Sequence, residues 1–201
     1  MKSPALNVSD MIEFSRLMLR LQEVIRAIHV PGRDTKENDV EHSYQLAMMA
    51  WYLNTSGRLG YNVDNLVRYA LVHDLAEAYA GDVSALDLKA RIGKREREEA
   101  AIQRIREEFP AAEEIIAAVE RYENLSDEEA RFVYALDKLM PMVTVYLADG
   151  RTWHEEGQDF ELIHHCQGPK IAISAPVDQL YQQLKTIFLR QPQLFGATAL
   201  P

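Results

Sequence analysis

The sequence predicts an all-α protein, a single compact bundle of seven or eight helices. Three observations support this fold class. Apolar residues recur at helical spacing through most of the 201-residue chain. No segment alternates apolar and polar residues between hairpin turn residues, and capping residues, prolines and glycines divide the chain into helix-length segments. A helical bundle therefore has no competitor among the fold classes.

Composition narrows the possible functions. Hydrophobic residues make up 47% of the chain, enough for a buried core, and the longest apolar runs are shorter than the roughly 20 residues that cross a bilayer. The 22 Lys and Arg against 31 Asp and Glu give a net charge of −9, which would repel long nucleic acid. The single cysteine, Cys166, cannot form an internal disulfide. We therefore expect a cytoplasmic protein without a leader, a membrane partner or a long nucleic acid partner.

Four helical segments are predicted in the first half of the chain: 10–28, 40–54, 64–79 and 89–109. Pro31 and Gly32 end the first segment, Asp64 caps the third, Gly81 ends it, and Gly93 interrupts the fourth. The charged run 94–97 within the fourth segment is typical of a solvated helix face with i,i+4 pairs.

The second half begins with Pro110, which suits the first turn of a helix over 111–122. Ser126 with Glu129, and Thr152 with Glu155, have the spacing of capping boxes for two further helices, and Pro176 begins the last one. We expect one domain over residues 1–201, with a core of about 10–150, C-terminal helices over 152–190 and a frayed tail over 191–201.

Polar residues interrupt three of the predicted apolar helix faces. His42 lies at the end of a core stripe, His73 and Asp74 lie on the inner side of the third helix, and Asp137 lies in the middle of a buried face. Each residue alone also fits an ordinary hydrogen-bonded polar group. Because a buried charge is costly unless it is paired or metal-bound, two imidazoles and two carboxylates could converge between three helices.

The segment after His73 and Asp74 adds two carboxylates. Glu77 lies one helical turn beyond His73, so its carboxylate can reach a water held by a metal at the His-Asp pair, and Asp82 follows Gly81 on the same side.

Together, Glu41-His42, His73-Asp74 with Glu77 and Gly81-Asp82, and Asp137-Lys138 resemble the HD-domain metal-dependent phosphohydrolases. Within that superfamily the chain looks most similar to the YfbR-like 5′-deoxynucleotidase branch, and the resemblance spans roughly residues 10–149. It implies that the metal ligands are His42, His73, Asp74 and Asp137. It also implies that Glu77 and Asp82 handle the attacking water and the protons.

No histidine occurs between Leu75 and Trp153, where two-metal members of the superfamily recruit further ligands, so the resemblance favours one divalent ion. Mixed imidazole and carboxylate ligands suit Mn, Co, Zn, Ni or Fe equally. A phosphate clamp needs cations, and Arg26, Lys89 and Arg33 border the inferred site.

The chain departs from the branch at two places that affect substrate preference. Prolines usually follow the Gly-Asp pair, where this chain has 83–87 without proline, and a tryptophan usually follows the arginine, where Arg26 is followed by Ala27.

The predicted function is release of phosphate from deoxyribonucleoside 5′-monophosphates. Two alternatives stay open: a deoxynucleoside triphosphate triphosphohydrolase of the same branch, and a non-catalytic protein that binds nucleotide or metal. Trp51 and Trp153 fit core or subunit contacts, and exposed helix faces suggest a homodimer or a higher homo-oligomer.

Overall fold

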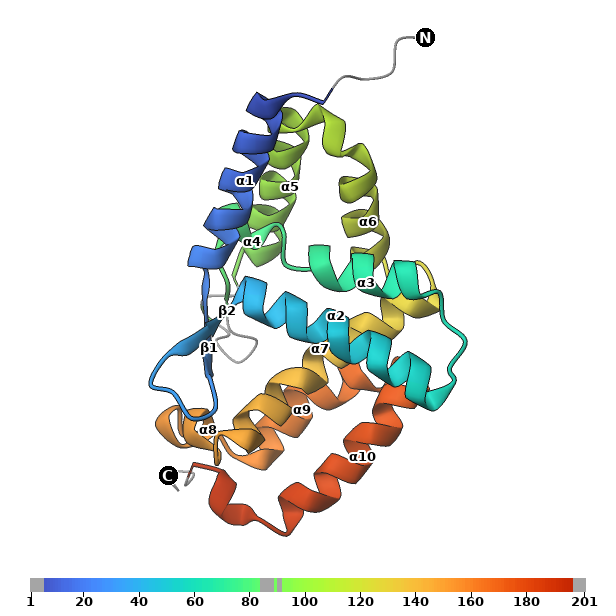
Figure 1. Ribbon diagram of the computed structural model, residues 1–201. Coiled ribbons are helices and arrows are strands. Elements are labelled where there is room, and N and C mark those ends of the chain that lie inside the picture. The colour runs from blue at the N-terminus through green and yellow to red at the C-terminus, as the bar shows by residue number, and fades with distance from the viewer. Residues whose placement is uncertain (1–5, 84–88, 90–91, 197–201) are drawn as a thin grey trace.

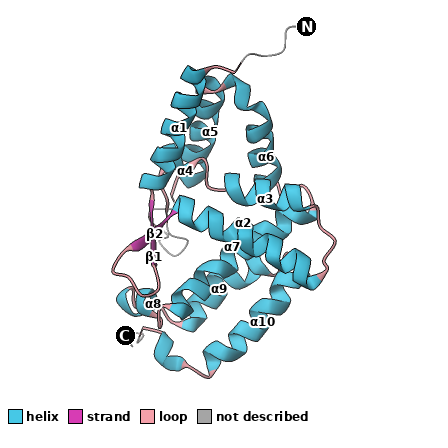
Figure 2. Cartoon of the chain, in the orientation of Figure 1, coloured by secondary structure: helices cyan, strands magenta, loops and turns pink. Residues whose placement is uncertain are grey.

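The computed structural model describes residues 6–83, 89 and 92–196, and this part of the chain is almost entirely helical (Figure 1, Figure 2). The all-α prediction is thus confirmed. The α-helices are α1 Val8–Glu23, α2 Asp39–Gly57, α3 Val63–Val72, α4 Glu77–Ala80, α5 Lys94–Glu108, α6 Glu113–Glu123, α7 Glu128–Leu147, α8 Arg151–Glu155, α9 Phe160–Ile171 and α10 Ala175–Leu189. Two 3₁₀ helices, η1 Pro110–Ala112 and η2 Pro192–Leu194, and two strands, β1 Ile25–His29 and β2 Lys36–Asn38, complete the described elements.

Helices α2 and α7 lie at the centre of the molecule, between α1, α5 and α6 on one side and α9 and α10 on the other (Figure 1). Helix α2 packs on α3, and α7 packs on α3, α9 and α10. The main core joins these helices through fully buried side chains such as Leu46, Leu66 and Phe132. A smaller cluster, which includes Leu17 and Ile105, joins α1 to α5.

The first predicted helix is too long, because it includes a strand. Helix α1 ends at Glu23, and Ile25–His29 pairs antiparallel with Lys36–Asn38 in a hairpin (Figure 2). The apolar residues of β1 continued the helical period, yet β-branched residues also favour strands, so the local pattern was ambiguous. The hairpin carries Arg26 as a strand residue and turns it toward α2.

The third predicted helix is broken where the sequence suggested continuity. Helix α3 ends at Val72, residues 73–76 form turns, and α4 begins at Glu77. Within the break, the N–H of Leu75 donates to the carbonyl of Val72, and the N–H of Glu77 donates to the carbonyl of Asp74. Both bonds join residues three apart, as in a 3₁₀ turn, whereas α-helical bonds join residues four apart. The predicted cap is also displaced, because Asn62, not Asp64, accepts from a backbone N–H of the first turn.

Neither predicted capping box forms. Asp127 caps α7 by accepting from the N–H of Ala130, and Glu129 instead accepts from the backbone N–H of Asn62. Gly150 precedes α8, and the Thr152 hydroxyl instead accepts from the backbone N–H of His29. In both cases the side chain accepts a hydrogen bond from a distant segment instead of capping its own helix. The prediction that Pro176 begins the last helix is confirmed, since proline occupies the first turn of α10.

The segment after Gln191 was expected to fray, but its described part is packed. Leu194 is buried, and Phe195 stacks on Trp153 with 4.8 Å between ring centroids. Trp153 is therefore a core residue, whereas Trp51 is 49% exposed on α2. Among the described residues, no helix combines the length and the apolar character needed to span a membrane.

Candidate active site

Three of the predicted metal ligands converge in the interior of the bundle. His42 Nε2 lies 2.9 Å from Asp137 Oδ1, and His73 Nε2 lies 3.6 Å from the same oxygen. One donor atom from each residue lies within 4.8 Å of the others, and all three residues are buried. The centroids of the two imidazole rings are 5.3 Å apart. Helices α2, α3 and α7 thus bring together residues that are far apart in the sequence.

Local structure places each of these side chains. Asn38 and Glu41 form a capping box at the start of α2, which puts His42 in the first turn. His73 follows the last residue of α3, where the chain leaves the helix. Asp137 projects from the middle of α7, four residues before Pro141. The role of Glu41 is therefore to cap the helix that carries His42.

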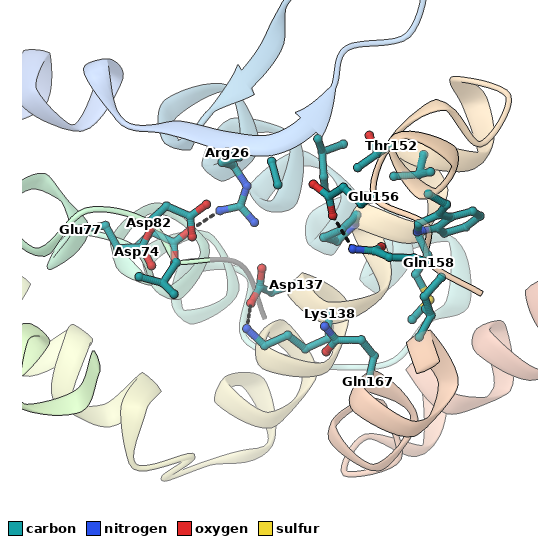
Figure 3. Close-up of a pocket in the computed structure, with 18 of the residues that line it drawn as sticks. Arg26, Asp74, Glu77, Asp82, Asp137, Lys138, Thr152, Glu156, Gln158 and Gln167 are labelled. Carbon is teal, nitrogen blue, oxygen red and sulfur yellow. Dashed lines mark hydrogen bonds and ion pairs between the residues drawn. The ribbon is translucent and has the colours of Figure 1, made fainter. Parts of the chain in front are cut away.

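Asp74 completes the predicted ligand set and is also held by an arginine. Its Oδ2 lies 2.9 Å from His73 Nε2 and accepts a hydrogen bond of 2.8 Å from Arg26 Nη1. The same nitrogen donates to Asp39 at 3.2 Å, and Arg26 Nε lies 3.4 Å from Glu37. Figure 3 shows the guanidinium reaching from β1 to the acidic side of the site.

The chemistry of these residues fits a divalent ion. His73 donates from Nδ1 to the carbonyl of Ala70, and none of the described residues gives its buried Nε2 a hydrogen bond of good geometry. His42 Nδ1 lies 3.0 Å from Glu37. In both imidazoles, Nδ1 is thus occupied and Nε2 faces the carboxylates, the arrangement that orients histidine as a metal ligand. His42, His73, Asp74 and Asp137 would hold the ion.

The pKa values of the metal-free cluster indicate that its carboxylates stabilise a positive charge beside them. Burial lowers the pKa of His73, but Asp74 and Asp137 outweigh it and raise that pKa to about 10. Burial raises the pKa of Asp137, but Lys138, His42 and His73 hold it well below its usual value. The cluster therefore carries protonated imidazole beside ionised carboxylates.

Glu77 is buried at the start of α4 and is held by Lys94, a residue of the charged run that the sequence predicts on a solvated helix face. Lys94 Nζ lies 2.9 Å from Glu77 Oε1 and 2.9 Å from Glu98. Glu77 Oε2 is buried and has no hydrogen-bond partner among the residues that the structure describes. Burial, and next the charge of Asp74, raises the pKa of Glu77 to about 10, while Lys94 opposes the rise. The spacing of Lys94 and Glu98 had revealed only their own helix pair.

These residues lie at one end of a cleft that encloses about 920 Å³, part of it open to solvent. Asp74, Glu77 and Asp82 line one side, and Asp137 and Lys138 line the floor (Figure 3). The charged end therefore holds both predicted catalytic carboxylates.

Two of the three predicted phosphate-binding cations do not line this cleft. Arg33 lies in the turn between β1 and β2 and lines a separate hollow with Asp34, Asp149 and Arg151. Lys89 is exposed in a turn before α5. Among the described residues, the cations that do line the cleft are Arg26, Lys94 and Lys138. The sequence departure at 83–87 falls largely on residues 84–88, outside the described part of the chain.

Comparison with known proteins agrees with the metal-binding chemistry that the geometry of the site suggests. Residues 18–177 match the HD domain family. The 5′-deoxynucleotidase HDDC2 of Mus musculus is 37% identical over 65% of this chain and 65% of its own length, and that of Homo sapiens is 36% identical over 64% and 63%. The match thus spans a little less than two thirds of these relatives. A predicted metal-dependent phosphohydrolase from Magnetospirillum magnetotacticum MS-1 has a similar structure, with a TM-score of 0.81, 27% identity, and coverage of 94% of this chain and 98% of the other.

Proposed function

This chain belongs to the HD domain family, and we propose that it is a metal-dependent 5′-deoxynucleotidase that releases phosphate from deoxyribonucleoside 5′-monophosphates. The observation that carries the proposal is the buried cluster of His42, His73 and Asp137 beside Asp74, at the charged end of a cleft. The names of the HDDC2 relatives support the substrate class.

The ligand cluster supplies the electrophilic part of the reaction. A divalent ion held by His42, His73, Asp74 and Asp137 would supply a Lewis acid for the phosphoryl group. His73 and Asp137 are buried, so water does not screen the charges that face the phosphate. The identity of the ion stays open among Mn, Co, Zn, Ni and Fe, because imidazole and carboxylate ligands accept all of them.

Glu77 and Asp82 are the groups that move protons. Water attacks the phosphorus atom, a P–O bond forms, and the bond to the 5′ oxygen of the sugar breaks. Lys94 binds Glu77 Oε1, which leaves Oε2 to accept the proton of the attacking water. A divalent ion bound beside Asp74 would lower the raised pKa of Glu77 and so allow it to act as this base. Asp82 lines the same side of the cleft and supplies the proton that the leaving sugar oxygen needs.

Arg26 and Lys138 bind the phosphate. Both line the charged end, and both are bound to carboxylates of the ligand set, Arg26 to Asp74 and Lys138 to Asp137 at 2.5 Å. A substrate phosphate offers these cations further acceptor oxygens, so they neutralise charge that develops in the transition state.

The experiment that tests the function is a phosphate-release screen. Deoxy- and ribonucleoside mono-, di- and triphosphates are assayed with Mn, Co, Zn, Ni and Fe in turn, and the products are separated to distinguish phosphate from triphosphate. We expect phosphate from the deoxyribonucleoside 5′-monophosphates. Release of triphosphate would instead favour the triphosphohydrolase alternative. Nucleotide binding without turnover under every metal would favour the non-catalytic alternative.

A further inference from the structure

The end of the cleft opposite the charged cluster is lined by different chemistry. Its apolar walls come from α7, α8 and α9 through Met142, Val145, Trp153 and Ile163. Val145 lies eight residues beyond Asp137 on α7, or about 12 Å along the helix axis. This length is comparable to the span from the phosphate to the base in a nucleotide, so a substrate whose phosphate lies at the charged end would place its base here.

Glu156 and Gln158 are among the polar side chains that face the cleft at this end, opposite Asp74 and Glu77, together with Thr152 and Gln167 (Figure 3). Gln158 is only 6% exposed, and its Nε2 donates a hydrogen bond to Glu156 Oε2. The backbone N–H of Gln158 donates to the carbonyl of Trp153 at 2.8 Å, and its carbonyl accepts from Gly196 at 3.0 Å. Gln158 is thus held at both its backbone and its side chain, and it positions Glu156.

The hydrogen-bonding capacity of Glu156 selects among bases. An ionised carboxylate accepts hydrogen bonds and donates none. Within the described part of the chain, Gln158 donates to Oε2 of Glu156, and Oε1 is left to accept a hydrogen bond from a ligand. An exocyclic amino group on a base is a donor and matches such an acceptor, whereas the corresponding carbonyl of uracil or thymine would bring two acceptors together.

We propose that Glu156, positioned by Gln158, makes the enzyme prefer nucleotides whose base carries an exocyclic amino group. The inference rests on the proposed function and adds the base to it. Cytosine, adenine and guanine would be favoured over uracil and thymine. Glu156 acts as a specificity residue and stands apart from the metal and proton chemistry, because it lies on α8's C-terminal side, across the cleft from Asp74 and Glu77.

The test compares dCMP with dUMP, which differ at the 4-position of the same pyrimidine ring, an amino group against a carbonyl. For the wild-type protein with its metal bound, we expect kcat/KM for dCMP to exceed that for dUMP by about tenfold, a typical value for one specific contact to a base. A ratio below about threefold in the wild type would overturn the proposal.

Glu156→Gln is the decisive variant, because an amide presents either a donor or an acceptor and tolerates both bases. The dCMP to dUMP ratio should fall below about threefold, mainly through faster turnover of dUMP. Glu155→Gln is the matched control. Glu155 is the neighbouring carboxylate but pairs with His29 and Arg151 instead of lining the cleft, so its variant should keep the wild-type ratio. A high ratio that persists in Glu156→Gln would overturn the proposal.

The same assay separates failure of this inference from failure of the proposed function. Hydrolysis of dCMP and dUMP at equal rates would contradict only the base preference. Absence of hydrolysis of any deoxyribonucleoside monophosphate would contradict the proposed function. In that case, titration of the metal-loaded protein with dCMP and dUMP measures the base preference directly, and equal dissociation constants would overturn it.

Discussion

At the scale of single residues, the environment of His73 turns its Nε2 toward the carboxylates as in a metal ligand, and the same carboxylates hold a proton on the ring in the metal-free protein. Its Nδ1 is bound to the carbonyl of Ala70, while Nε2 is buried among Asp74 and Asp137. Truncation of His73 would remove this nitrogen ligand, and no neighbouring side chain among the described residues can replace it.

We expect His73→Ala to lose bound metal and phosphate release together, by 10-fold or more in metal affinity, as is typical for a damaged ligand shell. Metal content after purification and turnover with added metal provide the measurement. His165→Ala is the matched control, since His165 is exposed on α9. Equal metal content in the two variants would contradict the assignment of His73 as a ligand.

Glu77 provides a prediction that separates catalysis from binding. Glu77→Ala should keep its metal and bind nucleotide but lose on the order of 10²-fold or more in kcat, because it removes a proton acceptor that acts in the transition state. The readouts are kcat, KM and metal content. A parent rate in Glu77→Ala would transfer the role of base to Asp82.

The raised pKa of His73 predicts how metal affinity depends on pH. In the metal-free protein the pKa of His73 is about 10, so at neutral pH the ring carries a proton that must leave before Nε2 binds an ion. Metal affinity should therefore fall as the pH falls below about 10, and binding at pH 7.5 should release at least one proton per ion. Calorimetric titration in two buffers that differ in ionisation enthalpy measures this number. Metal binding without proton release would contradict the assignment.

At the scale of elements, the start of α2 connects helix stability to the site. Asn38 accepts from the N–H of Glu41 at 2.9 Å, and Glu41 accepts from the N–H of Asn38 at 3.2 Å. His42 follows directly. The turn that this box closes therefore determines where one of the imidazole ligands lies.

We expect Asn38→Ala to destabilise the protein by about 1 kcal/mol, the usual effect of losing an N-cap, and also to weaken metal binding. Asn62→Ala is the matched control, because Asn62 caps α3 at the end away from His73. It should lower the unfolding free energy similarly and leave metal affinity unchanged. Chemical denaturation and metal titration of both variants give the comparison, and equal metal affinities in the two would contradict the role of the α2 cap.

At the scale of the whole molecule, the site joins parts of the chain that otherwise touch mainly through apolar side chains. His42 comes from α2, His73 and Asp74 from the turn after α3, and Asp137 from α7. An ion held by all of them binds only the folded protein, so it stabilises the fold as a ligand does.

Metal loading should consequently raise Tm. At a free metal concentration 100 times the dissociation constant, the stabilisation is about 2.7 kcal/mol, or roughly 5–10 °C for a chain of this length. Differential scanning calorimetry with metal and with a chelator gives the shift. His73→Ala should show almost none. A chelator-insensitive Tm in a protein that demonstrably binds metal would mean that the ion lies outside the core cluster.

The prediction of a homodimer or a higher homo-oligomer also belongs to this scale and stays a prediction. Helix α2 exposes Tyr44, Met48, Trp51 and Tyr52 on one face. Sedimentation of the wild-type protein measures the state directly.

The sequence by itself determined the fold class and singled out the buried polar residues that we propose as metal ligands. Helical periodicity reports which face of a segment is buried, and this information is local, so the helices and their approximate ends could be predicted. A histidine or aspartate on such a face is conspicuous for the same reason. His42, His73 and Asp137 were therefore recognisable before any distance between them was known.

Only the tertiary structure decided how distant segments meet. The residues of β1 fit a helix as well as a strand. In the folded protein they form a strand that pairs with β2, and Arg26 on this strand contacts Asp74. Lys94 looked like a surface residue, because its partner Glu77 lies 17 positions earlier. Long-range contacts of this kind leave no periodic trace in the sequence, since they depend on where whole helices pack. For the same reason, the sequence does not predict that Glu156 and Gln158 line one end of a cleft, because α7, α8 and α9 form that end together.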